Sequence, residues 1–435
     1  MIILAVLEPM FVQVRGIRRN TLALNALYLM LSTFVLAGSG FVFWTVVART
    51  YDAAAVGLAT AMLSVAGLLS LLSQAGFDTT FVRFLPSAEH KGDYINSGFV
   101  LVALTATLLG VGSAVVLPRL SPSLDILTSL PVAAGFVLFS VVTALGTLVN
   151  AVFLASKRAG YILMANTALG LAKITLPLVI AHGEAVVIVL LASAAQVVGL
   201  FFGVLRLRRC YGYRFAPVLK LEVLRAVWAY SSSMYAAGIL NLLPPTLLPL
   251  LVVHFLKPAA AAYYYMAFTI AGVLYAIAYG SMQSMFAEGS HNQMALRSYV
   301  IRSARMAGLL LLPSVGVLMV CGPGILSLFG SDYTQQATPV LQLFAASALP
   351  VAVYSALGAI FKVTKNLRAG ITMNAVYAVC VLGISYLALP VYGLVGVGWA
   401  WFGGNVVACL TGVMFVRKSK KGAEDGTIAS ARRRC

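Results

Sequence analysis

The chain has 435 residues, of which 61% are hydrophobic and only 10% are charged, and its mean hydropathy is +0.96. A soluble domain usually carries about 25% charged residues, and a disordered chain is poor in apolar ones, so both classes are excluded. What remains is an all-α polytopic membrane protein. The formal net charge is +18, and its meaning depends on where the basic residues lie.

Twelve stretches of the sequence are long and apolar enough to cross a bilayer, for which a helix needs about 20 residues. Residues 1–20 precede them; they lack the basic start and the cleavage site of a signal peptide and are interpreted as a cytoplasmic leader. The predicted spans are 21–48, 54–82, 97–117, 131–154, 161–181, 185–205, 224–255, 259–286, 306–329, 337–361, 369–389 and 394–416.

The distribution of Lys and Arg gives the expected orientation, because short cytoplasmic loops are enriched in both. If the N-terminus lies inside, the outer loops hold only Arg49, Arg119 and Lys257, and Lys173 lies within a span. Every other basic residue then lies on the cytoplasmic side, near anionic lipid. Both termini are therefore expected in the cytoplasm, with the protein in the cell membrane. The bilayer accounts for the charge, and nucleic acid is not expected as a partner.

Motifs for catalysis and for metal binding are missing from the sequence. The cysteines are scattered, and no zinc motif or phosphate-binding loop is present. The predicted loops are also too short for a catalytic domain. We therefore expect no enzymatic activity, no catalytic residue, no metal and no cofactor.

The two halves of the chain repeat each other weakly. A shift of 206 places Ala53-Ala54-Ala55 on Ala259-Ala260-Ala261, and a shift of 209 places Gly203-Val204 on Gly412-Val413. Because each half contains six spans, two lobes related by a pseudo-twofold axis along the membrane normal are expected. The predicted domains are an N-lobe, a basic cytoplasmic linker, a C-lobe and a basic cytoplasmic tail, at 21–206, 207–223, 224–416 and 417–435.

The repeat also indicates a weak point in the first helix of each half. At the shift of 206, the Gly-Ser-Gly run of the first span falls on the Pro-Pro pair of the seventh. Proline kinks a helix, paired glycines weaken one, and interrupted helices at matching positions mark the binding region of many transporters. A static kink at a packed crossing is the alternative. The hinge candidates are Gly38, Gly40, Pro244 and Pro245.

Short runs of sequence carry a family resemblance: Arg19-Asn20-Thr21, Phe43–Arg49 followed by Ala55–Ala59, Gly76–Arg83, Leu328–Tyr333 and Gly393–Gly398. On these runs the chain resembles the multidrug/oligosaccharidyl-lipid/polysaccharide (MOP) flippase superfamily, specifically its polysaccharide-biosynthesis or O-antigen (Wzx-like) branch. The resemblance covers nearly the whole chain. It implies two six-helix lobes, as in MATE transporters, with alternating access and a lipid-linked sugar as the cargo.

Two departures favour this branch over others of the superfamily. The lipid II flippases typically carry two additional helices, which are not found in this sequence. The drug-exporter branch often carries an acidic residue in its first helix, and the first span here has none.

Lys173 lies about halfway along the fifth span, where an unpaired charge costs about 2.5–3.5 kcal/mol. Asn166 shares its helical face, and the hairpin should bring Thr143 or Thr147 of the fourth span close. We interpret Lys173 and Asn166 as substrate-binding residues, with the ammonium group sensing a phosphate or a coupling proton. The alternative is a Lys that is neutral, or bound by carbonyl groups inside the first lobe.

Asp78 and Arg83 lie near the inner end of the second span, five residues apart, which is poor spacing for a helical ion pair. Asp78 is the ion-coupling candidate, for a proton or sodium; a helix-end residue bonded locally is the alternative. Arg83 either anchors the topology or captures a phosphate at the cytoplasmic mouth.

The eighth span carries an aromatic and polar stripe that the second span lacks. A tyrosine offers a ring face to a sugar and a hydroxyl for hydrogen bonding, so the stripe indicates a lobe specialised for cargo, with helix packing as the alternative. Asn241 in the seventh span either lines the cavity or bonds across helices. The stripe consists of Tyr264, Phe268, Tyr275, Tyr279 and Gln283.

The function predicted from these features is a flippase that moves a polyprenyl-pyrophosphate-linked oligosaccharide to the outer leaflet for polysaccharide biosynthesis. Its expected partners are this substrate, the bilayer and polysaccharide assembly proteins. A MATE-type ion-coupled exporter of small amphipathic solutes is the first alternative. A membrane glycan polymerase is the second, but it would need a charged outer loop, and the longest, around Arg119 to Leu130, is nearly uncharged.

Overall fold

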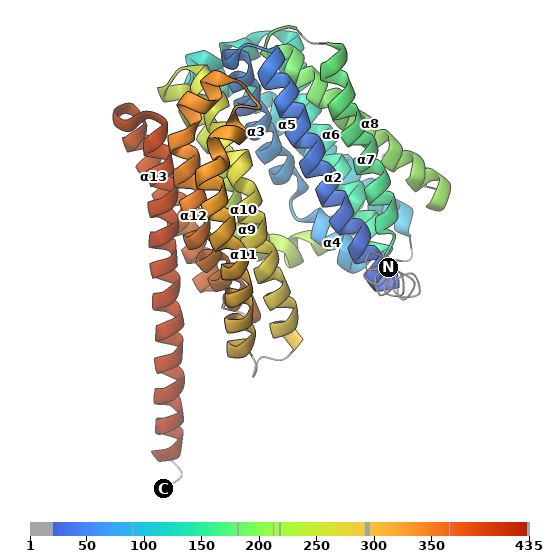
Figure 1. The fold of residues 1–435 in the computed structure, drawn as a ribbon. Coiled ribbons are helices and arrows are strands. Elements are labelled where there is room, and N and C mark those ends of the chain that lie inside the picture. Colours follow the sequence, from blue (N-terminus) through green and yellow to red (C-terminus); the bar gives the residue numbers. More distant parts are fainter. Residues whose placement is uncertain are drawn as a thin grey trace, which may run out of the picture. The chain divides into compact units, whose positions relative to one another are not determined.

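The computed structural model describes residues 21–432 except 89, 181, 212, 217–218, 292–295 and 365. Every regular element in this part of the chain is a helix (Figure 1), which confirms the all-α class. The predicted leader lies outside the described residues. The elements are α2 (Thr21–Thr50), α3 (Ala53–Gln74), α4 (Phe77–Phe84), the 3-10 helix η1 (Leu85–Ser87), α5 (Lys91–Leu120), the 3-10 helix η2 (Pro122–Thr128), α6 (Leu130–Ala155), α7 (Ala159–Val179), α8 (Ala185–Tyr211), α9 (Leu221–Phe255), α10 (Pro258–His291), α11 (Leu296–Leu326), α12 (Ser331–Val363) and α13 (Leu367–Arg432).

Eleven helices in the described part of the chain are long and apolar enough to cross a membrane. One of them, in α13, runs from Leu367 to Lys418 over 52 residues, which at 1.5 Å per residue is about 78 Å, more than twice the hydrocarbon thickness. The backbone leaves helical geometry inside α13 at Gly393, whose φ of 57° and ψ of −141° suit a residue without a Cβ. Division of α13 at Gly393 gives the twelve crossings predicted.

The second predicted span is shorter in the structure. It ends with α3 at Gln74 because Ala75 and Gly76 both have positive φ, of 46° and 86°, which breaks the helix. The short helix α4 follows, with Phe77 and Phe81 buried. Asp78 therefore lies in the first turn of α4 and not within the membrane-spanning helix.

The chain forms two compact units. The first contains residues up to Asp52 and Met62–Tyr235; the second contains Ala53–Ala61 and the residues from Ala236 onward. The start of α3 packs within the second unit so closely that a Cβ on Gly57 would lie 1.7 Å from the carbonyl oxygen of Pro258. The domain boundaries drawn from the sequence remain a prediction.

In the first unit, α2 and α7 lie side by side and run in the same direction. The side chain of Asn25 accepts a hydrogen bond of 2.8 Å from the backbone of Ala159, at the start of α7. Further along both helices, Asn166 donates one of 2.7 Å to the hydroxyl of Ser32. Parallel packing is what the first and fifth spans of an alternating bundle require.

The segment that follows α8 is fixed to the start of α5 by Asn96, which is only 3% exposed. The Asn96 side-chain oxygen accepts hydrogen bonds from the hydroxyl of Tyr213, at 2.5 Å, and from the backbone of Ala216, at 3.3 Å. Its amide donates to the carbonyl of Arg214. Burial raises the pKa of Tyr213 to about 12, so its hydroxyl stays protonated and donates throughout the physiological pH range.

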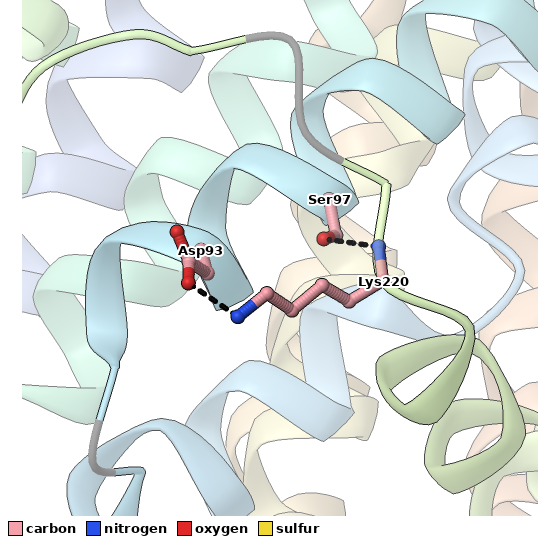
Figure 2. Close-up of polar contacts among 3 residues, drawn as sticks. All are labelled: Asp93, Ser97 and Lys220. Atoms are coloured by element: carbon pink, nitrogen blue, oxygen red, sulfur yellow. Dashed lines mark hydrogen bonds and ion pairs between the residues drawn. The ribbon is translucent and has the colours of Figure 1, made fainter.

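A second pair of contacts holds the end of the same segment (Figure 2). The backbone of Lys220 donates to the hydroxyl of Ser97 at 3.0 Å, and the Lys220 ammonium group lies 2.6 Å from the carboxylate of Asp93. The ion pair is partly exposed, so it contributes less than the buried amide. The segment from Tyr213 to Lys220 is thus tied to the first unit before α9 begins.

Replacement of Asn96 by Ala should release this segment. Three hydrogen bonds are lost, and a buried partner left unsatisfied typically costs about 1–3 kcal/mol, so trypsin should cleave after Arg214 and Lys220 at least about fivefold faster. Limited proteolysis of the purified protein measures this. Asp93→Asn is the matched control and should change cleavage little; equal cleavage of the wild type and Asn96→Ala would contradict the interpretation.

Candidate functional site

Four helices of the first unit, α2, α6, α7 and α8, line a partly open cavity of about 270 Å³. Its apolar lining comes from side chains such as Leu36, Val149, Leu169 and Leu200. Its polar lining consists of hydroxyl and amide groups and a single cation. The polar lining residues are Thr143, Thr147, Asn150, Asn166, Lys173 and Gln196.

The cavity borders helix contacts that depend on glycine. A Cβ on Gly199 of α8 would lie 2.8 Å from the Cβ of Leu169, and one on Gly203 would lie 2.8 Å from a methyl group of Val149. These glycines let α8 approach α6 and α7 closely. Gly146 differs, because a Cβ there would meet nothing within 4 Å. The backbones are therefore close at the edge of the cavity, while space remains next to Gly146.

Lys173 is the charged residue of the lining. Its ammonium group makes no hydrogen bond or ion pair with the residues that the structure describes. The sequences of α2, α6, α7 and α8 contain no Asp and no Glu. None of the helices that form the cavity therefore offers Lys173 a carboxylate.

The other polar side chains differ in how far their hydrogen bonds are satisfied. Asn166 is buried and donates to Ser32, and Thr147 donates to the carbonyl of Thr143 at 3.1 Å. The Thr143 hydroxyl oxygen is buried without a partner in the described part of the chain. This hydroxyl is a donor available inside the cavity. The structure thus brings Lys173 and Asn166 together with Thr143 and Thr147, as the helix spacing predicted.

Asn150 and Gln196 also line the cavity, and the sequence analysis did not single them out. Neither side chain forms a hydrogen bond with the described residues. The spacing of the sequence could have identified both residues. Asn150 follows Thr143 by seven residues, and Gln196 precedes Gly203 by seven. Each pair lies two turns apart on one helix face.

In the second unit, Asn241 bonds across helices. Its amide donates to the hydroxyl of Tyr354 at 2.8 Å, and that hydroxyl donates to the side chain of Asn374 at 2.6 Å. The three residues belong to α9, α12 and α13. Asn241 was expected either to line the cavity or to bond across helices, and the structure contains the interhelical bond. Substrate binding by Asn241 stays a prediction.

The tyrosine stripe of α10 lies mostly in a packed aromatic cluster. Tyr264 is fully buried, and Tyr275 is 5% exposed. The hydroxyl of Tyr275 donates to the carbonyl of Phe344 at 2.8 Å, and its ring stacks on Trp401 with 6.0 Å between centroids. Among the stripe residues whose side chains are described, Tyr279 is the most exposed, at 39%. Gln283 was also predicted to bind substrate, but its side chain lies outside the described part of the structure.

The remaining candidates are placed as follows. Asp78 lies in the first turn of α4, where a carboxylate interacts favourably with the helix dipole, and Arg83 is exposed in the last turn with its guanidinium 5.4 Å from the ring of Phe84. The ion-coupling and phosphate-capture roles stay predictions.

The hinge candidates lie inside regular helices. Residues Gly38 and Gly40 are within α2, and Pro244 and Pro245 are within α9, and both helices are assigned without interruption. The predicted break in the helix is thus not present at either place. Bending at these positions stays a prediction.

The glycine contacts allow a test of the packing around the cavity. Gly199→Ala should destabilise the protein by about 1–3 kcal/mol, because the new methyl group meets the Cβ of Leu169, which is fixed to its backbone. Gly146→Ala should be neutral or stabilise by up to about 1 kcal/mol, because Ala favours helix and meets nothing. Thermal unfolding followed by tryptophan fluorescence compares the two; similar midpoints for both variants would contradict the described packing.

Comparison with known proteins identifies the family. Residues 22–286 match the family model of polysaccharide biosynthesis proteins. No curated protein matches the chain in sequence.

Solved structures match over most of the chain. An inward-facing multidrug resistance MATE family transporter of the MOP superfamily is 14% identical, with a TM-score of 0.68 over 91% of this chain and 99% of that one. The lipid II flippase MurJ in an inward closed conformation is 13% identical, with a TM-score of 0.71 over 90% of this chain and 87% of that one.

A MOP superfamily transporter from Pyrococcus furiosus, described as having a binding pocket of reverse polarity, is 14% identical, with a TM-score of 0.59 over 90% of this chain and 94% of that one. At these identities the likeness concerns the fold. It confirms the MATE-like architecture that the sequence predicted. The chain belongs to the polysaccharide biosynthesis protein family and has the fold of the MOP superfamily.

Proposed function

We propose that the protein is a flippase that moves a polyprenyl-pyrophosphate-linked oligosaccharide from the inner to the outer leaflet of the cytoplasmic membrane by alternating access. The observation that carries this proposal is the acid-free cavity with Lys173, in a chain that belongs to the polysaccharide biosynthesis family. A pyrophosphate is an anion that must leave water, and a cation in the protein interior offsets that loss. The likeness to a lipid II flippase supports the same class of cargo.

The solute exporter is the alternative that the fold alone allows, because a multidrug resistance transporter matches as well. The charge of the lining favours the flippase. Exporters of cationic drugs need acidic or apolar surfaces, whereas α2, α6, α7 and α8 carry no acidic residue. We propose no enzymatic activity, and the families of similar fold are transporters and flippases.

The proposed orientation has both termini in the cytoplasm, on the basis of the basic residues in alternate loops. The tied segment from Tyr213 to Lys220 is then cytoplasmic. Polysaccharide assembly proteins are the proposed partners, because they would use the translocated cargo.

Translocation of a fluorescent polyprenyl-pyrophosphate oligosaccharide in proteoliposomes tests the function. The wild type should flip it, and Lys173→Ala should lower the rate at least about tenfold, which corresponds to a loss of about 1.4 kcal/mol in the transition state. Lys257→Ala is the matched control, because Lys257 is an exposed lysine outside the cavity and its loss should leave the rate unchanged.

The outcomes separate the candidate functions. Flipping that survives in a folded Lys173→Ala protein would remove Lys173 from the mechanism. If no polyprenyl-linked sugar is flipped under any ion gradient, while a small amphipathic solute is transported, the exporter replaces the flippase.

A further inference from the structure

The charge of Lys173 has no source of neutralisation on the helices around it. Lys173 is about two thirds of the way along α7, and an uncompensated charge at the centre of a membrane helix costs about 2.5–3.5 kcal/mol on insertion scales. None of the four lining helices carries an acidic residue. A counter-charge for Lys173 must therefore come from outside these helices.

The groups around the cavity have the chemistry of an oxyanion site. Thr143 offers a buried hydroxyl without a partner, and Asn150 and Gln196 offer amide donors that bind none of the described residues. Hydrogen bonds from such donors and from an ammonium group to an anion are shorter and stronger than bonds between neutral groups. These groups come from α6, α7 and α8, so an anion at the centre would meet donors from three helices.

The volume limits the ligand. A cavity of about 270 Å³ is large enough for several water molecules. Pockets for drug-sized ligands begin at about 300 Å³. A single phosphate group with a few waters fits a space of this size, which lies just below that range.

The internal repeat allows the position of Lys173 to be compared with the matching position in the second unit. At a shift of 208, Asn166 falls on Asn374 and Lys173 falls on Val381 of the second unit. Val381 is fully buried, and a Cβ on Gly404 would lie 2.4 Å from its methyl group. In the first unit this position holds Lys173 beside the cavity. In the second unit it holds Val381, which is tightly packed.

We infer that the cavity between α2, α6, α7 and α8 is a binding site for one phosphate-sized oxyanion, with Lys173 as its cation and Thr143, Asn150 and Gln196 as hydrogen-bond donors. The inference rests on the proposed function only for the source of the anion. That source is either one phosphate of the lipid-linked cargo or free inorganic phosphate.

Binding is tested with radiolabelled inorganic phosphate and pyrophosphate on the full-length protein purified in detergent. The wild type should bind one phosphate per chain. Lys173→Met should weaken binding at least about tenfold, because it removes the charge-assisted bond, while Lys173→Arg should retain most of it. Lys257→Met, which removes an exposed lysine, should bind as the wild type does.

A second variant guards against misfolding of the first. Gln196→Leu removes a donor without changing the charge and should weaken phosphate binding several-fold. Thermal midpoints monitor the fold of each variant. The inference is overturned if the wild type binds neither phosphate nor pyrophosphate, or if a folded Lys173→Met and Gln196→Leu both bind as tightly as the wild type.

The source of the anion is decided with vesicles. Inhibition of phosphate binding by polyprenyl pyrophosphate, together with slow flipping by Lys173→Met, assigns the site to the cargo. Phosphate binding that the lipid does not inhibit, with normal flipping by Lys173→Met, assigns it to free phosphate. In the second case the oxyanion site stands, while the part of the proposed function that gives Lys173 a role in flipping fails.

Discussion

Hydrocarbon offers no hydrogen-bond partner, so each polar group within the membrane must find one inside the protein. Most polar side chains of this chain do so within their own helix or with one neighbouring helix. Asn166 binds Ser32 between α7 and α2, and Asn241 binds Tyr354 between α9 and α12. These bonds tie the first helix of each half to a later one. Thr143, Asn150, Gln196 and Lys173 are exceptions, since their side-chain polar groups have no partner among the described residues, and Lys173 is the one of the four that can carry a charge.

The cavity lies beside close helix contacts that depend on glycine. Gly199 lets α8 approach Leu169 of α7, and Gly170 lets α7 approach Ser39 of α2, where a Cβ would lie 2.9 Å from the hydroxyl. Next to these contacts, Asn150 and Gln196 line the same cavity. Glycines at the helix contacts thus border a cavity that is lined by polar side chains.

Sequence periodicity predicted the helices and the grouping of Lys173 with Asn166 and Thr147, because neighbours in an alternating bundle follow from helix spacing. It did not predict the end of α3 at Gln74, because hydropathy carries no information on the positive φ of Ala75 and Gly76. For that reason Asp78 was assigned to a span, whereas it lies in the first turn of α4.

The stripe on α10 shows a different limit of sequence reasoning. A row of tyrosines has the same spacing whether it faces a cavity or a packed neighbour, and the partners that decide belong to distant helices. Here Phe344 of α12 accepts the Tyr275 hydrogen bond, and Trp401 of α13 stacks on its ring. Nothing in the spacing of α10 itself could reveal either residue.

The two halves of the chain repeat each other weakly in sequence, but their interiors are filled differently. The sequence suggested that the second half is specialised for cargo, since its tyrosines have no counterparts in the first. In the structure, the interior of the second unit is filled by aromatic rings, with Phe268 and Trp401 only 4.9 Å apart between centroids, and by Val381 where the first unit has Lys173. A filled core resists deformation, whereas a cavity lined by a lysine and hydrogen-bond donors has room for an anion. In the proposed flippase, the first unit would therefore detect the charge of the cargo, and the second would keep its shape while access alternates.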